Sequence, residues 1–541
     1  MIEQRSSTLP RWAVILILLA TLSIALRSVP TLFNLPIEED GYMVLTNARH
    51  MAQGDGVSYD GHSLNNGFQP LWVFLNAPVY RLVQLDPEKM VRATFLLHWL
   101  FFLGSVVLFG AITRDAISLE KAEQKQLLFW LGALVYGGAL ATWQKQFNGL
   151  ETSCALFFYA LVWRYYQSGR AETRRGAIGL GALLGLLVLA RIDTVFLVIL
   201  LSIQRLFISR GQPLAERLVT AAAMGTTAFL VSLPWWAYNV IQFGHLTPTS
   251  GLGLQAWGFV PKRVFHGVDA AATMLTPHYY DGDFINHSLY GGRVILGVRI
   301  VVALLLLVWL WRRREALGWR QLPSMPRDAT IRQATRPQRT LEFALVLAIS
   351  NVVLLVWYVV SSWAWFFYER YLTPWMLLVT PAYALVLFEY TRRWRWLPAV
   401  GAILLAVPIT LVSIATHFDG HLKKNIMLSD LLPLVKKSVP DADWIAISQS
   451  GTVGYFRDRV VNLAGVSNMA VIPFQDHMWD YLDREGINWL CDWPSIVEPF
   501  LGSKIQDGTW ILVDQRDVEG GDFQFQLYRR RVPIARNLPP R

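Results

Sequence analysis

Three consecutive acidic residues, Glu38, Glu39 and Asp40, follow the first long apolar run of the sequence. Carboxylates this close raise one another's pKa, and a carboxylate with a raised pKa can act as a general base near neutral pH. A solvated acidic cluster at a membrane edge would have the same composition. The amphipathic pattern after Tyr42 predicts a helix around 43–51 that holds the acids in one place. Position in a pocket, rather than the triplet itself, would make them catalytic.

A fourth acid, Glu151, lies in the segment Asn148-Gly149-Leu150-Glu151-Thr152, where another helix is expected to start. Asn148 or Gly149 can cap that helix, and Glu151 then lies in the first turn, where the helix dipole favours an anion by about 0.3–1 kcal/mol. The alternative is that Glu151 faces the same cavity as Asp40 and orients a hydroxyl group or a cation.

Arg191 and Asp193 interrupt an otherwise continuous apolar stretch. Ionisable residues inside a membrane segment cost about 2.5–3.5 kcal/mol each on insertion scales and are usually paired and functional. If they form the outer turn of a helical hairpin, most of that cost disappears. Both interpretations stay open at this point.

Arg370 precedes another apolar segment, next to Glu369 and four residues before Pro374. A guanidinium group there can bind a lipid phosphate through a bidentate contact, or it can pair with Glu369. Lys262 is a less specific candidate, because any loop near anionic headgroups can carry cations. The histidines have no metal-ligand spacing, and no Walker A, GxSxG or HExxH motif is present, which argues against ATP-driven and metalloprotease chemistry.

The composition defines the elements that must position these residues. The chain has 541 residues, of which 53% are hydrophobic and 16% charged, whereas soluble proteins carry about 25% charged residues. The apolar residues form long runs separated by short basic clusters, which predicts a polytopic membrane protein. The net charge of +10 is scattered and builds no basic stripe, so we expect no nucleic-acid partner. Two cysteines exclude a disulfide framework and a thiolate metal site.

About eleven membrane spans are expected from runs of sufficient length. They lie near 11–29, 93–113, 127–146, 152–167, 177–190, 194–209, 218–241, 294–311, 341–361, 372–390 and 396–416. A cytoplasmic N-terminus places most Lys and Arg in cytoplasmic loops, among them Arg170, Arg174 and Arg175. An odd number of spans then puts the C-terminal segment outside.

Residues 1–416 are therefore expected to form a transmembrane module with two long outer loops, about 30–92 and 242–293. Loops of this length are usually functional or disordered, and their aromatic content favours order. The first contains turn signals at Asn65-Asn66-Gly67 and a predicted interfacial helix at 70–75. Residues 417–541 have a soluble composition. Strands are predicted at 444–447, 459–463, 510–513 and 523–527 and helices at 427–438 and 473–485, which indicates a small extracytoplasmic α/β domain.

The order of these motifs resembles the GT-C membrane glycosyltransferases that use polyprenyl-phosphate sugars, among them bacterial mannosyl- and arabinosyltransferases. The resemblance rests on the following segments: Glu39-Asp40-Gly41-Tyr42, 48–56, Asn66-Gly67-Phe68-Gln69-Pro70-Leu71-Trp72, 148–152, 189–193, Phe243-Gly244 with Pro248 and Ser250, and Arg370-Tyr371-Leu372 with Pro374. Gly454-Tyr455 and 461–465 in the C-terminal domain extend it. The first acid of the family's pair is Glu39 here, and Glu38 precedes it.

The resemblance implies a polytopic α-helical GT-C fold in a bacterial cytoplasmic membrane and an inverting transfer of one sugar to an acceptor hydroxyl. Asp40 would be the base and Glu39 would tune it. The donor phosphate would be bound by Arg370, Arg191 and Lys262, and the substrates also by Glu151, Asp193, Asn66 and Tyr42. The expected partners are a polyprenyl-phosphate-linked donor, membrane lipid, and a glycan, lipid or protein acceptor. No cofactor is certain, and a divalent cation stays open.

Two other classes of function compete with this hypothesis. A transporter or lipid flippase usually places ionisable groups at the membrane midplane, on broken helices related by an internal repeat. Here the acids are expected at outer helix ends, and no repeat is visible in the sequence. A noncatalytic envelope scaffold would instead disperse the acids around its rim.

Overall fold

The computed structural model describes residues 2–34, 36–207, 212–279, 289–315, 317, 334–391, 393–394, 396–418, 425–518 and 524–536. The end of the predicted second outer loop (280–288) and the centre of the basic stretch before Arg339 (318–333) lie outside the described residues. The segment 419–424, just after the predicted domain boundary at 416, also lies outside them, so that boundary stays a prediction.

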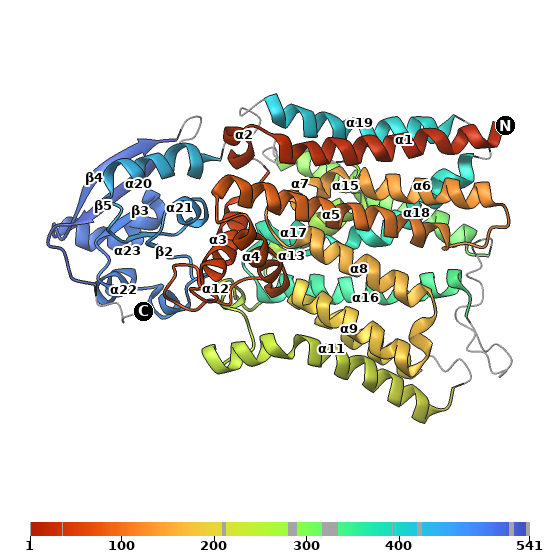
Figure 1. Cartoon of the computed structure of the whole chain (residues 1–541), viewed down its shortest axis with the longest axis horizontal. Helices are drawn as coiled ribbons and strands as arrows, with labels where there is room; N and C mark the ends of the chain where they lie inside the picture. The colour runs from red at the N-terminus through yellow and green to blue at the C-terminus, as the bar shows by residue number, and fades with distance from the viewer. Residues whose placement is uncertain are drawn as a thin grey trace.

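A bundle of helices forms the N-terminal part of the molecule (Figure 1). Its elements are α1 (Ile2–Leu22), η1 (Ser23–Leu26), α2 (Val29–Asn34), α3 (Glu39–Gln53), α4 (Pro70–Leu82), α5 (Pro87–Arg114), α6 (Ala122–Gly137), α7 (Leu140–Phe147), α8 (Thr152–Gln167), η2 (Arg170–Glu172), α9 (Arg174–Ala190), η3 (Ile192–Thr194), α10 (Val195–Phe207), α11 (Leu214–Phe243), α12 (Thr249–Gly253), α13 (Pro261–Leu275), α15 (Leu289–Arg313), α16 (Arg336–Ser361), η4 (Trp365–Phe367), α17 (Tyr368–Tyr371), α18 (Pro374–Thr391) and α19 (Leu397–Phe418).

Every predicted span falls on a helix or on a bent helix pair of this bundle. Among the described residues, six helices are long and apolar enough to cross a membrane, and up to eight elements do so if each of two bent pairs counts as one span. The pairs are α6 with α7, bent by 66°, and the segment Trp365–Tyr371 with α18, bent by 49°. Helices α8, α9 and α10 have 16, 17 and 13 residues and are therefore shorter than these six. The chain is thus a multi-pass helical membrane protein.

Helices α9 and α10 form a hairpin rather than one broken span. Arg205, in the last turn of α10, donates to the carbonyl oxygen of Ala171, which lies just before α9. The two helices therefore run antiparallel, and Arg191 and Asp193 lie in the turn that joins them. This result decides between the two arrangements that the sequence left open.

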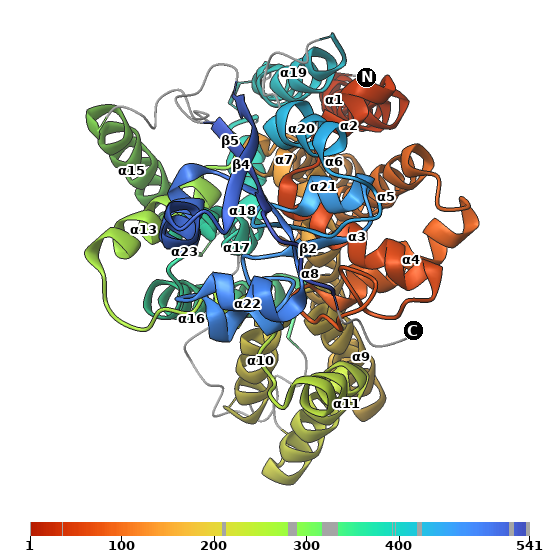
Figure 2. The same cartoon turned by 90° about the vertical axis from the view of Figure 1, so that its left-hand side faces the viewer.

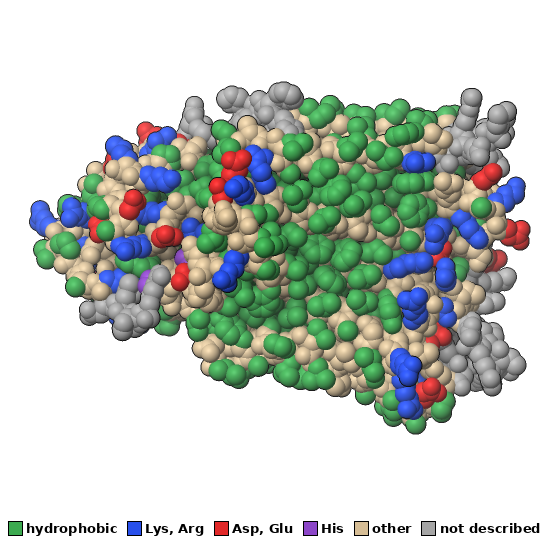
Figure 3. Space-filling model, viewed as in Figure 1, with side chains coloured by type: hydrophobic (Ala, Val, Ile, Leu, Met, Phe, Trp, Pro, Cys, Tyr) green, Lys and Arg blue, Asp and Glu red, His purple; other side chains and the backbone are tan. Residues whose placement is uncertain are grey.

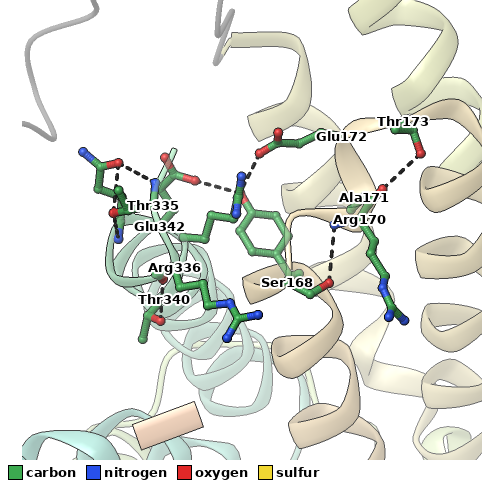
Figure 4. A network of polar contacts seen from close by, with 12 residues as sticks. Ser168, Arg170, Ala171, Glu172, Thr173, Thr335, Arg336, Thr340 and Glu342 are labelled. Atoms are coloured by element: carbon green, nitrogen blue, oxygen red, sulfur yellow. Dashed lines mark hydrogen bonds and ion pairs between the residues drawn. The ribbon is translucent and has the colours of Figure 1, made fainter. Parts of the chain in front are cut away.

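The surface of the bundle is divided by polarity (Figure 3). A broad hydrophobic belt covers its middle, as expected for side chains that face lipid. At the end opposite the C-terminal part, Asp115 pairs with Arg114, Arg164 and Arg336. A network at the same end joins α8, η2 and α16, with Arg339 donating to Glu172 at 2.9 Å (Figure 4). Polar contacts thus join the helix ends on this side.

The C-terminal part is a small α/β unit at the other end of the bundle (Figure 1 and Figure 2), and we call this end of the bundle the sheet end. Its elements are η5 (Met427–Leu431), α20 (Leu432–Ser438), β1 (Ile445–Ile447), α21 (Gly451–Phe456), β2 (Val460–Asn462), η6 (Met469–Phe474), α22 (Met478–Glu485), β3 (Trp489–Asp492), α23 (Pro494–Gln506), β4 (Trp510–Asp517) and β5 (Gln524–Arg530). The strand order is β2-β1-β3-β5-β4, with β1 parallel to β2 and β3, and β5 antiparallel to β3 and β4.

The alternation of side chains along β1 explains how the sheet is covered on both faces. Ile445 and Ile447 pack with Val435 of α20, whereas Ala446 packs with Leu482 of α22 on the other face. The predicted strands and the helix at 427–438 are present, whereas β3, α21 and α23 were not predicted. Of these, β3 and α21 are short, and a strand of four fully buried residues has no period-two alternation that could reveal it. The predicted helix at 473–485 begins at Met478 because Pro473 belongs to a preceding 3-10 segment.

Candidate active site

The acidic triplet lies at the start of α3, at the sheet end of the bundle (Figure 1). Asp40 and Glu39 occupy the first turn, where the helix dipole favours negative charge. The helix ends at Gly54, whose φ of +98° is a left-handed conformation that suits glycine. A Cβ atom on Gly41 would lie 2.1 Å from the carbonyl oxygen of Asn148, so α3 and the 148–151 segment can approach this closely because residue 41 is glycine.

The three acids of the triplet have three different partners. Glu38 accepts hydrogen bonds from Gln144 at 3.0 Å and from Asn148 at 3.1 Å. Glu39 accepts two from Thr452 of α21, one from the backbone N–H and one from the hydroxyl group. Successive side chains on a helix point in different directions, which separates these contacts in space.

Asp40 faces the arginine predicted for the donor phosphate. Its Oδ2 atom accepts from Nη1 of Arg370 at 2.9 Å, in an ion pair that joins α3 to α17. The guanidinium group also lies over the rings of Phe367 and Tyr371, at 4.7 and 5.2 Å from their centroids. Glu369, the other partner proposed for Arg370, instead pairs with Lys145 at 2.8 Å. That alternative is therefore wrong: the chain fold brings Asp40, not the sequence neighbour, to Arg370.

Arg191 and Asp193 form a second buried ion pair beside the first. Nε of Arg191 donates to Oδ1 of Asp193 at 3.0 Å, and its Nη1 donates to the backbone oxygen of Arg370 at 2.9 Å. The hydroxyl group of Tyr358 donates to Asp193 at 2.7 Å, and its ring stacks on Tyr371 at 4.3 Å. The α9–α10 turn thus holds the backbone that carries Arg370. Tyr358 was not among the predicted site residues, since one tyrosine in an apolar span carries no signal of its own.

Glu151 is the buried acid of this cluster. It occupies the N-cap position of α8, yet its side chain makes no capping bond, and Asn148 caps the end of α7 instead. The side chain is 7% exposed and interacts electrostatically with both Arg191 and Arg370. Within the part of the chain that the structure describes, no hydrogen bond or ion pair is formed by this carboxylate. The capping interpretation of this side chain is therefore not supported, and its role in substrate binding stays a prediction.

Burial changes the acidity of Glu39. The pKa of Glu39 is raised from the usual 4.5 to about 7: desolvation is the largest cause, the charge of Asp40 acts in the same direction, and the hydrogen bonds from Thr452 oppose the shift. The sequence predicted a raised pKa from charge repulsion within the triplet. In the folded chain, desolvation is the larger cause.

The other predicted binding residues, Asn66, Tyr42 and Lys262, have partners outside the Asp40–Arg370 ion pair. The amide group of Asn66 donates to Asn239 at 3.1 Å and accepts from the backbone N–H of Thr249 at 2.9 Å, which joins the two outer loops. Tyr42 is buried, and its hydroxyl group donates to the carbonyl oxygen of Phe33 at 2.6 Å. Lys262 is exposed on α13 and lies 4.3 Å from the ring centroid of Trp365, at the start of the segment that leads to Arg370.

A metal site was left open by the sequence. No group of three or more His, Cys, Asp or Glu side chains that could hold a metal ion is found among the described residues. Two acids of the cluster, Asp40 and Asp193, each pair with an arginine.

The fold can be compared with known proteins. No protein-family model matches the chain, and no curated protein sequence matches it. ArnT from Cupriavidus metallidurans bound to undecaprenyl phosphate is similar in structure, with a TM-score of 0.56 and 13% identity over 96% of this chain and 98% of that one. The apo form of the same protein has a TM-score of 0.55 and 12% identity, over 96% of this chain and 97% of that one.

The archaeal oligosaccharyltransferase AglB from Archaeoglobus fulgidus, solved with an inhibitory peptide and a dolichol-phosphate, is also similar. Its TM-score is 0.51 at 11% identity, over 95% of this chain and 74% of that one. Identities this low establish the fold alone. The helical bundle with its α/β unit at one end, predicted from the sequence, is thus confirmed as the GT-C membrane fold.

Proposed function

We propose that this protein transfers a single sugar, a hexose or a pentose, from a polyprenyl-phosphate donor to an acceptor hydroxyl group at the outer face of a bacterial cytoplasmic membrane. The observation that carries the proposal is the Asp40–Arg370 ion pair at 2.9 Å, with Glu151 and Arg191 beside it at the sheet end of a GT-C fold. A base and a fixed cation side by side are what displacement of a phosphate leaving group requires.

In this mechanism the acceptor oxygen attacks the anomeric carbon while the bond from that carbon to the phosphate oxygen breaks, which inverts the anomeric centre. Asp40 takes the proton of the acceptor hydroxyl group. The polyprenyl phosphate leaves with its negative charge stabilised by Arg370, and because phosphate is a weak base it needs no general acid. The incoming phosphate competes with Asp40 for the guanidinium group, so donor binding releases the carboxylate to act as base.

The other predicted site residues bind or orient the substrates and take no part in the proton transfer. Arg191 holds the backbone of Arg370 and adds positive charge to the phosphate site, and Asp193 orients Arg191. Glu151 accepts hydrogen bonds from hydroxyl groups of the sugar. Lys262 attracts the headgroup from the membrane surface, while Asn66 and Tyr42 maintain the shape of the outer loops around the substrates.

The proposed donor and orientation have independent support. ArnT and AglB, which share the fold, were solved with undecaprenyl phosphate and dolichol-phosphate. Three arginines gather around Asp115 at the end opposite the sheet, and positive residues are enriched on the cytoplasmic side of membrane proteins. This supports a cytoplasmic N-terminus and an extracytoplasmic C-terminal part. The acceptor is an envelope glycan, lipid or protein.

Transfer in membranes supplied with lipid-linked sugar tests the proposal. Asp40→Asn should insert normally but lose about 100- to 10,000-fold in turnover, as expected for loss of a general base. Asp86→Asn is the matched control, because Asp86 caps α5 through the N–H of Lys89 and asparagine caps equally well. Near-normal turnover of Asp40→Asn would refute the base assignment. Mass spectrometry of envelope glycans from a deletion strain would identify the sugar and its attachment.

Transport is the less favoured function. The ion pairs of Asp40 and Asp193 lie at the sheet end of the bundle, where α3 and the α9–α10 turn are located. A transporter of lipid-linked sugars would instead use charges near the midplane. Donor uptake without sugar transfer in reconstituted vesicles would reverse this preference.

A further inference from the structure

Helix α21 lies alongside α3 and is bonded to it at both ends. At its start, the N–H and the hydroxyl group of Thr452 donate to Glu39. At its end, Arg49 donates to the carbonyl oxygens of Tyr455 at 3.0 Å and of Gly454 at 3.1 Å. The acid Glu39 therefore lies at the N-terminus of α21 and the cation Arg49 at its C-terminus, which is the arrangement that the helix dipole favours.

The fit between the two helices leaves no space. A Cβ atom on Gly451 would lie 2.1 Å from the backbone oxygen of Glu39 and 3.0 Å from the N atom of Met43. Tyr42 of α3 packs against Tyr455, with ring centroids 5.0 Å apart. The first turn of α3 is thus held between α21 on one side and the 148–151 segment on the other.

Glu39 and Asp40 are adjacent in the first turn of α3, so a contact that fixes the position of Glu39 also restricts the position of Asp40. Glu39 is held by Thr452, while Asp40 reaches Arg370 on a different helix. Rotation or displacement of this turn would move the Asp40 carboxylate away from its partner. A misplacement of about 1 Å at a reacting group can cost about 100-fold in rate.

We propose that Thr452 is a positioning residue for the transfer reaction: through Glu39 it fixes the turn of α3 from which Asp40 projects, so the C-terminal unit completes the active site. This inference rests on the proposed function and adds a residue of the C-terminal α/β unit, which contacts Glu39 rather than the Asp40–Arg370 pair. A substitution can remove the hydroxyl group of Thr452 without disturbing the backbone. Asn425 also donates to this hydroxyl group, at 3.4 Å.

The contact is expected to respond to pH. The pKa of Glu39 is raised to about 7 by burial, and the hydrogen bond from the Thr452 hydroxyl group lowers it. The ionisable groups that act on Glu39 include Asp40 and Tyr42 on the same helix and Tyr59 in the following loop. The ionised carboxylate accepts both bonds from Thr452, so the positioned state is favoured as pH rises through 7.

The test compares Thr452→Val and Thr452→Ser in the full-length protein. Valine has the shape of threonine but no hydroxyl group, and we expect kcat to fall about 10- to 100-fold with little change in the KM for donor. The rising limb of the pH profile should move to higher pH by about one to two pH units, since a bond that favours the charged form is lost. Serine should restore both values.

Ser438→Ala is the matched control, because it removes a hydroxyl group that contacts Asp514 in the same α/β unit. A Thr452→Val protein with wild-type kcat and an unmoved pH profile would overturn the positioning role. A fall in kcat that serine does not rescue, with the pH profile unchanged, would show a merely structural role and overturn it too. The proposed function fails separately, if Asp40→Asn stays active.

Discussion

Glu39 is expected to lower the stability of the folded protein in the pH range where it is ionised. Its folded-state pKa is about 7, above the usual 4.5, chiefly because burial disfavours the charge. Between these two values the folded state binds more protons than the unfolded state, so the contribution of this group to stability decreases as pH rises. Below 4.5 the group is neutral in both states and this cost is absent.

The size of the effect follows from the pKa. One pKa unit corresponds to about 1.36 kcal/mol, so the shift from 4.5 to about 7 amounts to about 3 kcal/mol by the time pH exceeds 7. Glu39→Gln keeps the shape and resembles the neutral acid, so it should avoid this cost. We expect the variant to be more stable than the wild type above pH 7 while catalysing transfer more slowly, because the neutral amide binds Thr452 less strongly.

Thermal unfolding of the detergent-solubilised protein at pH 5 and pH 8.5 would measure this difference. The Tm of Glu39→Gln minus that of the wild type should increase with pH, by several degrees in total. Glu38→Gln serves as the control for loss of charge within the triplet, because Glu38 accepts its hydrogen bond from Gln144, whereas Glu39 accepts from Thr452. A difference in Tm that is the same at both pH values would refute the reasoning, since it would show that Glu39 does not change its protonation on folding.

Three further outcomes follow from the site geometry. Arg370→Gln should raise the KM for the donor more than it affects acceptor use, because it removes the fixed charge at the phosphate; kinetics with each substrate varied separately would show this. Gly41→Ala should destabilise the protein by about 1–3 kcal/mol, as its Cβ would lie 2.1 Å from a backbone oxygen, whereas Gly225→Ala, with 3.6 Å to its nearest neighbour, should fold normally in a thermal-unfolding assay. Asp193→Asn should cost about 3–5 kcal/mol by leaving Arg191 buried without its counter-charge, which a lower Tm would report and an unchanged Tm would contradict.

Much of the architecture could be predicted from local patterns. Apolar runs long enough to span a membrane, such as 93–113 and 341–361, produced helices at the expected places, because in lipid a helix is the way for a single segment to satisfy its own backbone polar groups. The amphipathic pattern after Tyr42 likewise gave α3. Short elements such as β3 were missed because their burial depends on neighbours that lie far away in the sequence.

By itself the sequence determined the membrane class and supplied a short set of charged residues as candidates for the site. It could not assign partners to adjacent acids. Only the tertiary structure decided that Asp40 meets Arg370, that Glu39 meets Thr452, and that Glu369 is taken by Lys145. The physical reason is that residue type and helical period specify which face of its own helix a side chain occupies, whereas its partner depends on which distant helix packs there, and close contacts such as that at Gly41 set that packing.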